Sequence, residues 1–392
     1  MNILGIIAEY NPFHNGHLYH LKSALSKTNA DYTVCVMSGN FIQRGEPALF
    51  NKFIRTDMAI KNGIDLVVEL PVYYSVATAE KFAYAGIKLL NGCGANYVSF
   101  GCETADISQL ISISNLLSNE TNEYKSELKK QLDLGLSYPD ARSKVISKLL
   151  NISAHIINQP NNILAIEYLK SILQINPAIT PVPIERVDSN YYDTDSKTNI
   201  LSATGIREKL IKLDDIDIFV PQNTLKLMEN PIFLQNFEQL ILFSLRKMSI
   251  EELKKLPDVT EGLENRIFSA VISSSSLTEL IDKIKTKRYT LARIKRILIA
   301  ALLGLSKKKL QEFDNDNGPQ YIRILGCNEK GKELLSIISQ KTSIPIVTSV
   351  NKFLSKANDL QKDMLYKDIL ATNIYTLLTS DKTMNLDYTR RI

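Results

Sequence analysis

The sequence predicts an α/β fold, in which a parallel sheet is followed by a mainly helical C-terminal region with a small α/β portion. Short runs of β-branched and aliphatic residues alternate with helical patterns through the first half of the 392 residues. Strands that alternate with helices form βαβ units, and the strands of such units pair in parallel. After Leu210 the pattern becomes mostly helical, which indicates a different kind of architecture.

The expected strands each end near a glycine, a proline or a polar cluster. They are Asn2–Ala8, Tyr32–Met37, Leu66–Leu70, Tyr97–Phe100 and Thr180–Val187. The helices expected between them are His17–Ser26, Lys52–Asn62, Ala77–Leu90 and Ile163–Ile175. The stretch Ile107–Ile152 contains no obvious strand, so it is interpreted as a helical insertion between two strands.

A segment rich in acids and turn residues follows the α/β half and marks a domain boundary. We therefore expect two domains, residues 1–212 and residues 213–392. The pattern of the second domain is helical from Pro231 to about Leu310. A short α/β pattern returns from Tyr321.

Composition excludes several classes of protein. The chain is 44% hydrophobic and 23% charged, as soluble globular proteins are, and its net charge of +5 permits nucleic-acid binding without demonstrating it. No basic leader precedes the first apolar run, and no stretch of about 18 apolar residues exists. The four cysteines form no CxxC pair, which favours reduced thiols over a zinc site. We expect a cytoplasmic protein without a membrane span.

The densest chemistry lies where the first strand meets the first helix, in the sequence EYNPFHNGH from Glu9 to His17. Amide groups at a helix start attract phosphate oxygens, and Gly16 allows a nucleotide to approach the backbone. His14 and His17 are three residues apart, on one face of the first turn. They can donate hydrogen bonds to phosphates and stabilise charge as pyrophosphate leaves, so both are candidate catalytic residues. The alternative is two ordinary histidines at a helix start.

A second cluster, LSATGIR from Leu201 to Arg207, has the composition of a phosphate site. Ser202 is a plausible N-cap, and Arg207 follows about one turn later. Hydroxyl groups and a guanidinium suit the β- and γ-phosphates, so Ser202, Thr204 and Arg207 are candidate ATP ligands. The alternative is a plain helix cap followed by a surface arginine.

HxGH after a first strand resembles the nucleotidyltransferase and class I aminoacyl-tRNA synthetase superfamily, and SATGIR resembles its second signature. Further short sequence segments lie at the ends of strands or at the start of a helix. SGNFIQRGEPA follows the second strand, VELP closes the third and FGCE closes the fourth. PNNIL opens a later helix, and IER ends the fifth strand. In parallel α/β sheets, ligands bind at these strand ends. Together these segments resemble the bacterial tRNA(Met) cytidine acetate ligase family, across essentially the whole chain.

The resemblance implies a Rossmann-like nucleotidyltransferase domain with a defined ATP site. The residues that it assigns to ATP are Ile7, Ala8, Glu9, Tyr10, Asn11, Pro12, Phe13, His14, Asn15, Gly16, His17, Leu18, Tyr19, His20, Gly101, Asn162 and Arg186. It also implies acetate as a substrate, an acetyl-adenylate intermediate, and N4-acetylation of the wobble cytidine of elongator tRNA(Met). Mg²⁺ is expected with ATP, but the sequence offers no dedicated metal site. No protein partner is implied.

The most basic region of the chain is Lys283 to Arg296, which is followed by Lys307, Lys308 and Lys309, and no acid interrupts Lys283–Lys309. Apolar positions at helical spacing give it one buried stripe and a basic outer face, and Tyr289 could stack on a base. The expected tRNA contacts are Lys287, Arg288, Arg293, Lys295 and Arg296. The alternative is a solvated face of lysine and arginine.

Two other functions compete with a tRNA acetate ligase. A small-molecule nucleotidyltransferase or carboxylate ligase, such as a pantothenate-type ligase, would need no RNA. The basic helix and the large C-terminal half argue against it. A non-catalytic RNA-binding protein with a vestigial site is opposed by the intact HNGH and SATGIR motifs.

Overall fold

The computed structural model describes residues 1–392 except 105–106, 187–198, 261, 287 and 391–392. Within the described residues, the main sheet has the strand order β7-β6-β1-β2-β5-β8-β9. Its strands are β1 (Ile3–Ala8), β2 (Tyr32–Ser38), β5 (Leu66–Leu70), β6 (Tyr97–Cys102), β7 (Thr180–Glu185), β8 (Ile322–Cys327) and β9 (Ile346–Val347). The five strands expected from the sequence are all present, and neighbouring ones pair in parallel.

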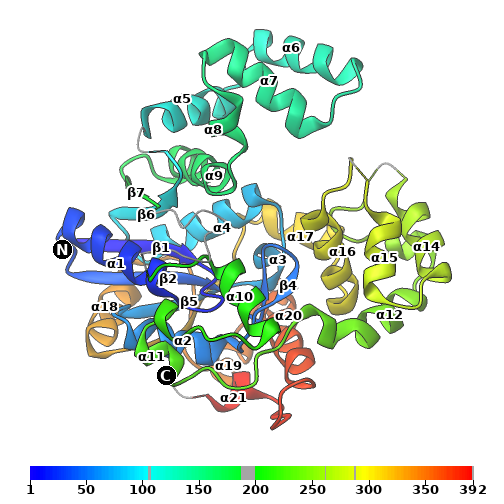
Figure 1. Ribbon diagram of the computed structural model, residues 1–392. Coiled ribbons are helices and arrows are strands. Elements are labelled where there is room, and N and C mark those ends of the chain that lie inside the picture. The colour runs from blue at the N-terminus through cyan, green and yellow to red at the C-terminus, as the bar shows by residue number, and fades with distance from the viewer. Residues whose placement is uncertain (105–106, 187–198, 261, 287, 391–392) are drawn as a thin grey trace.

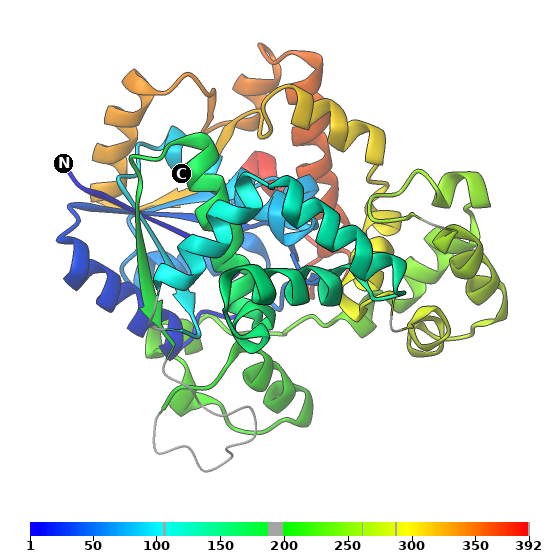
Figure 2. The ribbon, with the colours of Figure 1, turned by 90° about the horizontal axis from the view of Figure 1, so that it is seen from above.

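Helices surround the sheet and form two further lobes (Figures 1 and 2). Those of the first half are α1 (Asn15–Thr28), α2 (Lys52–Lys61), α3 (Val72–Ser75), α4 (Ala79–Gly92), α5 (Ile107–Ser118), α6 (Asn122–Asp133), α7 (Tyr138–Leu150), α8 (Ala154–Asn158) and α9 (Pro160–Ile175). Those of the second half are α10 (Ala203–Lys212), α11 (Gln222–Leu225), α12 (Glu238–Arg246), α13 (Ile250–Leu253), α14 (Leu263–Ser273), α15 (Leu277–Ile284), α16 (Leu291–Leu303), α17 (Lys307–Asn315), α18 (Glu329–Lys341), α19 (Val350–Leu354), α20 (Asp359–Thr376) and α21 (Leu386–Thr389).

Two strands from the second half of the chain, β8 and β9, join the edge of the sheet beside β5. Strand β8 pairs antiparallel with β5, and β9 pairs parallel with β8. The small α/β portion expected after Tyr321 therefore completes the same sheet. Strands from both sides of the boundary predicted after residue 212 share one hydrogen-bonded structure.

Alternation along the strands buries both faces of the sheet. In β2, Val34 and Val36 face one hydrophobic core, and Cys35 and Met37 face another. The first core lies under α4 and α9, and the second under α1 and α2. Side chains of successive residues point to opposite faces, which explains why these strands are apolar at every position. Two helix layers thus hold the strand ends in fixed positions.

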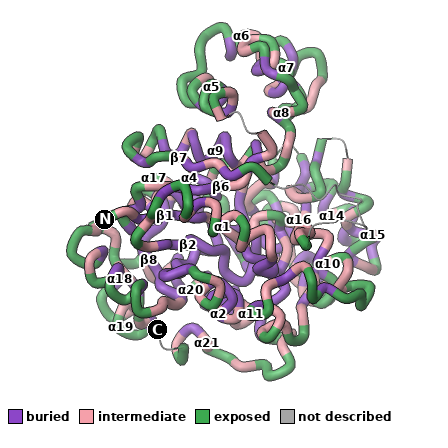
Figure 3. Tube along the Cα trace, turned by 60° about the vertical axis from the view of Figure 1, so that its left-hand side comes forward, coloured by how far each residue is buried: buried purple, intermediate pink, exposed green. Residues whose placement is uncertain are grey.

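The helical insertion expected over 107–152 is confirmed as α5, α6 and α7. These helices and α8 stand away from the sheet, and the chain returns to it through α9 (Figures 1 and 3). The insertion leaves at the carboxyl end of β6, beside Gly101. None of the described helices is long and apolar enough to cross a membrane.

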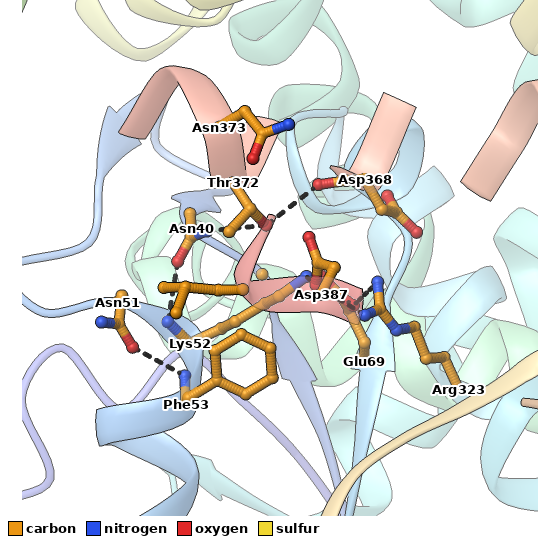
Figure 4. Close-up of polar contacts among 12 residues, drawn as sticks. Asn40, Asn51, Lys52, Phe53, Glu69, Arg323, Asp368, Thr372, Asn373 and Asp387 are labelled. Atoms are coloured by element: carbon orange, nitrogen blue, oxygen red, sulfur yellow. Dashed lines mark hydrogen bonds and ion pairs between the residues drawn. The ribbon is translucent and has the colours of Figure 1, made fainter. Parts of the chain in front are cut away.

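A buried group of charges joins early and late parts of the chain (Figure 4). The ammonium of Lys52 in α2 lies 2.7 Å from both Glu69 of β5 and Asp387 of α21. The guanidinium of Arg323 in β8 lies 3.0 Å from Glu69 and 2.5 Å from Asp387. All four side chains are at most 4% exposed, so the two cations and two anions neutralise each other inside the protein.

A third carboxylate, Asp368 of α20, lies beside this group. It accepts hydrogen bonds from the backbone N–H of Val72 at 2.7 Å and from the hydroxyl of Tyr321 at 2.5 Å. Burial, together with the negative charge of Glu69, raises its pKa to about 7. The protonated form of Asp368 is therefore favoured more than in an ordinary aspartate, which limits the excess negative charge of the group.

Candidate nucleotide site

The HNGH segment folds as a capped helix start at the carboxyl end of β1. His14 is the N-cap of α1 with extended backbone (φ −132°), and its Nδ1 accepts the Gly16 N–H at 3.0 Å. The Nδ1 of His17 accepts the His14 N–H at 3.3 Å, which completes a reciprocal capping box. The ring centroids of the two histidines are 3.7 Å apart. The helix begins at Asn15, two residues before the expected start.

Both imidazoles are held in a neutral state. Burial, with added repulsion from Arg186 and Arg207, lowers the pKa of His14 to about 3. Burial also lowers the pKa of His17 well below its usual value, and His14, His20 and Arg186 act in the same direction. Since each Nδ1 accepts a backbone N–H, each neutral ring must carry its proton on Nε2. The site therefore presents two Nε2–H donors, a suitable pair for phosphate oxygens.

His20 fixes the far end of this face of α1. Its Nε2 lies 2.8 Å from the hydroxyl of Ser99 in β6, and that hydroxyl donates to the carbonyl of Val182 in β7 at 2.9 Å. The Ser99 oxygen thus accepts from His20, whose Nε2 carries the proton. Burial, assisted by the charge of Arg186, lowers the pKa of His20 to about 4. One hydrogen-bonded chain joins α1 to two strands of the sheet.

The second cluster meets the first in space. Ser202 is the N-cap of α10, and its hydroxyl accepts the Gly205 N–H at 3.1 Å, as expected. The guanidinium of Arg207 donates to the carbonyl of Asn11 at 3.1 Å and to the hydroxyl of Thr204 at 3.1 Å. Two segments almost 200 residues apart therefore assemble one cationic, donor-rich site.

Gly101 and Arg186 lie at the carboxyl ends of β6 and β7, at the same edge of the sheet as the histidines that follow β1. A β-carbon on Gly101 would lie 3.5 Å from the Cγ of Arg186, so the arginine stem crosses this glycine. The charge of Arg186 contributes to lowering the pKa of His14, His17 and His20. Arg186 is thus close to the expected phosphate donors His14 and His17.

Several residues expected to touch ATP have structural contacts. The Asn15 amide donates to the carbonyls of Asn199 and Ile218, at 2.8 and 2.9 Å. Asn162 accepts the Glu103 N–H at 3.0 Å and donates to the carbonyl of Ile156 at 3.0 Å. The assignment of Asn15 and Asn162 to ATP stays a prediction.

The other residues of the expected ATP segment differ in how far they are buried. Tyr10, Asn11, Pro12 and Phe13 are buried, and the rings of Tyr10 and Phe13 lie 4.9 and 5.6 Å from His17. Ile7, Ala8 and Leu18 are half-buried and pack against the two cores. Tyr19 is 40% exposed.

Arg55 in α2 is a positioning residue that the sequence analysis missed. Its guanidinium is fully buried and donates to the backbone carbonyls of Glu9, Ser38, Gly39 and Phe50. It therefore ties the carboxyl end of β1 to that of β2. Burial lowers its pKa to about 10, so it stays charged at neutral pH. The only signal in the sequence was a second cation, Arg55 after Lys52, on the buried face of an amphipathic helix.

The expected basic helix corresponds to α16 (Leu291–Leu303), and its cations contact polar groups from elsewhere in the chain. Arg293 donates to the Asp258 carbonyl at 3.0 Å and to the Thr260 hydroxyl at 2.7 Å. Lys295 forms an ion pair with Glu46, and Arg296 forms one with Asp258 at 2.7 Å. The segment from Lys283 to Lys309 contains no acidic residue, but in the folded protein acidic residues from other segments lie against it.

The expectation that Tyr289 stacks on a base is wrong for this conformation. Its side chain is only 8% exposed, and the Arg293 guanidinium lies over its ring at 5.3 Å. Lys287 lies outside the described residues, and Arg288 has contacts of its own. The assignment of Lys287, Arg288, Arg293, Lys295 and Arg296 to tRNA stays a prediction.

Among the described residues, no group of three or more histidine, cysteine, aspartate or glutamate side chains is arranged to hold a metal ion. The donors at the helix start are two neutral imidazoles, backbone amides and arginines, a set that suits phosphate and not Mg²⁺. The chain therefore provides an anion site at this place.

Comparisons with known proteins agree with this geometry. The model of a family described as HIGH Nucleotidyl Transferase matches residues 1–389. A tRNA(Met) cytidine acetate ligase from Thermoanaerobacter sp. (strain X514) is 43% identical over 401 residues, covering 99% of this chain and 98% of the relative. One from Clostridium novyi (strain NT) is 39% identical over 400 residues, covering 99% and 98%.

Two solved structures share the whole fold. Thermotoga maritima TmcAL bound with alpha-thio ATP has a TM-score of 0.92 and 32% identity, covering 99% of this chain and 98% of that one. The apo form of TmcAL from the same organism has a TM-score of 0.94 and 33% identity, covering 100% and 99%. Together with the paired His14 and His17 at the start of α1, these full-length matches establish that the chain belongs to the tRNA(Met) cytidine acetate ligase family of HIGH nucleotidyl transferases.

Proposed function

We propose that this protein activates acetate with ATP and transfers the acetyl group to the exocyclic amine of the wobble cytidine of elongator tRNA(Met). The observation that carries the proposal is the pair of neutral imidazoles at the start of α1, beside Arg186 and Arg207. The printed names of the relatives and the nucleotide bound to the Thermotoga maritima structure support the same activity. A cytoplasmic location, where tRNA and reduced thiols are found, is part of the proposal.

The first step joins acetate to AMP. An acetate oxygen attacks the α-phosphorus of ATP, a new P–O bond forms, and the bond to the β-phosphate oxygen breaks to release pyrophosphate. The Nε2–H groups of His14 and His17, the amides of the first turn of α1 and Arg207 would stabilise the negative charge that develops. The chain's role in this step is to orient the triphosphate and neutralise charge. Mg²⁺ would supply further charge neutralisation on the phosphates.

The second step consumes the mixed anhydride. The amine nitrogen of cytidine attacks the acetyl carbonyl carbon, AMP leaves with the electron pair of the broken C–O bond, and the nitrogen loses one proton. This amine is a weak nucleophile, so it requires an activated acyl donor. The chemistry therefore uses no covalent acyl-enzyme, and no nucleophilic cysteine is required.

The test is acetylation by the purified protein with ATP, labelled acetate, Mg²⁺ and tRNA, without acetyl-CoA. We expect label in N4-acetylcytidine and release of AMP and pyrophosphate. Label from acetyl-CoA alone, or ADP as product, would contradict the adenylate chemistry. Acetate-dependent pyrophosphate exchange that never leads to tRNA acetylation would instead favour a carboxylate ligase without an RNA substrate.

A further inference from the structure

A short hairpin connects the nucleotide site to the basic helix. It consists of β3 (Phe41–Ile42) and β4 (Glu46–Pro47), and it leaves the main sheet at the carboxyl end of β2. Its base is firmly held, because the Ser75 hydroxyl donates to the Phe41 carbonyl at 2.9 Å and the Phe41 ring lies 5.6 Å from that of Phe237. The hairpin is therefore a rigid arm.

One side of the hairpin is bonded to the nucleotide site. The backbone N–H of Gln43 donates to the Glu9 carboxylate at 3.0 Å, and the Gln43 amide donates to the Ala77 carbonyl at 3.1 Å. Glu9 directly follows β1 and belongs to the expected ATP segment. Any shift of the hairpin would therefore displace the strand end that leads into HNGH.

The other side of the hairpin packs on the backbone of α16. Gly45 has φ +75°, and a β-carbon there would lie 2.2 Å from the amide nitrogen of Arg296. Glu46, one residue later, forms the ion pair with Lys295. Only a glycine allows an approach this close, so the hairpin tip is fitted to the helix.

Arg44 lies between these two contacts. It is exposed, and none of its side-chain atoms forms a hydrogen bond or ion pair with the described residues. Burial raises the pKa of Glu9, and among the opposing charges Arg44 has the largest effect, so the guanidinium lies near that carboxylate. By contrast, Arg293, Lys295 and Arg296 are engaged within the protein. Arg44 is thus an exposed cation near Glu9 that forms no hydrogen bond or ion pair within the described part of the chain.

We propose that Arg44 binds a phosphate of the tRNA strand that carries the acceptor cytidine, and so places the cytidine amine against the activated acetate. The inference rests on the proposed function. RNA is favoured over the phosphates of ATP because the hairpin extends from the ATP site toward α16, and because the ATP site has its own donors in His14, His17 and Arg207. A planar, exposed guanidinium on a rigid arm is well suited to a phosphodiester.

The test compares Arg44→Gln and Arg44→Lys with the parent and with Lys356→Gln, an exposed cation in the turn after α19. Arg44→Gln should lower kcat/KM for tRNA by about 10- to 100-fold, as expected for one lost bond to a charged group. The log–log salt dependence of tRNA binding should become shallower by about 0.7, the value for one phosphate on a single strand. Arg44→Lys should recover part of both effects, and Lys356→Gln should match the parent.

Three results would overturn the assignment or its basis. Unchanged tRNA affinity and salt slope in Arg44→Gln, with an active parent, would contradict the role of Arg44 alone. A loss of acetate-dependent pyrophosphate exchange as large as the loss of acetylation would move Arg44 to the ATP phosphates. A parent that exchanges pyrophosphate and acetylates no tRNA would contradict the proposed function itself.

Discussion

The imidazole rings of His14 and His17 lie nearly face to face, with centroids 3.7 Å apart and an angle of 30° between the planes. Two imidazolium ions at this distance would repel each other strongly. Backbone N–H groups occupy both Nδ1 atoms, and burial keeps both rings neutral. Each ring therefore carries its proton on Nε2 and can donate one hydrogen bond.

Replacing His17 with alanine should reduce acetate-dependent ATP–pyrophosphate exchange by about two to three powers of ten, as for the loss of one donor to a developing charge. His14→Ala should have an effect of similar size. The matched control is His155→Ala, whose side chain contacts Gln159 in the helical insertion, far from HNGH in the sequence. Near-normal exchange in a folded His17→Ala protein would exclude a phosphate role for this residue.

The protonation of the buried histidines can be measured directly. In the nucleotide-free protein, nitrogen-15 NMR should show His14 and His20 as neutral Nε2–H imidazoles at pH 5, because their pKa values are lowered to about 3 and about 4. A ring that titrates near its ordinary pKa of about 6.5 would contradict this state.

The same shift predicts how stability depends on pH. In the unfolded chain His20 gains a proton below pH about 6.5, and in the folded protein it does not, so stability is lost as pH falls. Between pH 7 and pH 5 the parent should lose about 2 kcal/mol more unfolding free energy than His20→Gln. Urea denaturation at the two pH values measures this difference, and equal losses would count against the lowered pKa.

Gly45→Ala should destabilise the protein far more than alanine at a second glycine with a similar backbone. Gly135 has φ +83° and no atom near its missing β-carbon, whereas Gly45 has φ +75° and faces the Arg296 backbone. Positive φ costs an alanine on the order of 1 kcal/mol at either place, and the clash adds about 1–3 kcal/mol at Gly45 alone. Thermal unfolding of both variants gives the comparison, and equal shifts would mean that the hairpin can move away from α16.

Asp387→Ala should cost about 3–5 kcal/mol of unfolding free energy, since it leaves buried Lys52 and Arg323 with too few carboxylates. Asp133→Ala, at the exposed end of α6, is the control and should change stability by less than about 0.5 kcal/mol. Chemical denaturation compares the two variants. A loss below 1 kcal/mol in Asp387→Ala would show that water or another group compensates the cations.

The sequence predicted the parts of the fold that local patterns determine. Buried strands such as Leu66–Leu70 and the capped helix after Ser202 have signals within a few residues. The antiparallel pairing of β8 with β5 has no such signal, because it depends on contacts more than 200 residues apart. Likewise, Glu46 and Asp258, which pair with the basic helix, are distant in sequence.

In the candidate site, too, the sequence predicted some features and could not predict others. Motif order was enough to predict that His14, His17 and Arg207 belong together. It could not show that the amides of Asn15 and Asn162 also donate to backbone carbonyls of the protein, and their assignment to ATP stays a prediction. Arg55, which holds four backbone carbonyls, had no motif at all.

The buried charge group is completed by residues that lie at the two ends of the chain. Ribosomes synthesise β1, β2 and α2 long before they reach Arg323 and Asp387, and chains fold from the N-terminal side as they emerge. During this interval the ammonium of Lys52 has only part of the anionic environment that later encloses it. The buried ion-pair group that joins α2, β5 and β8 thus stays incomplete until α21 docks. A chain that ended before Asp387 would carry every motif for ATP, and its buried Lys52 and Arg323 would be left with Glu69 as their one ion-pair partner in this group.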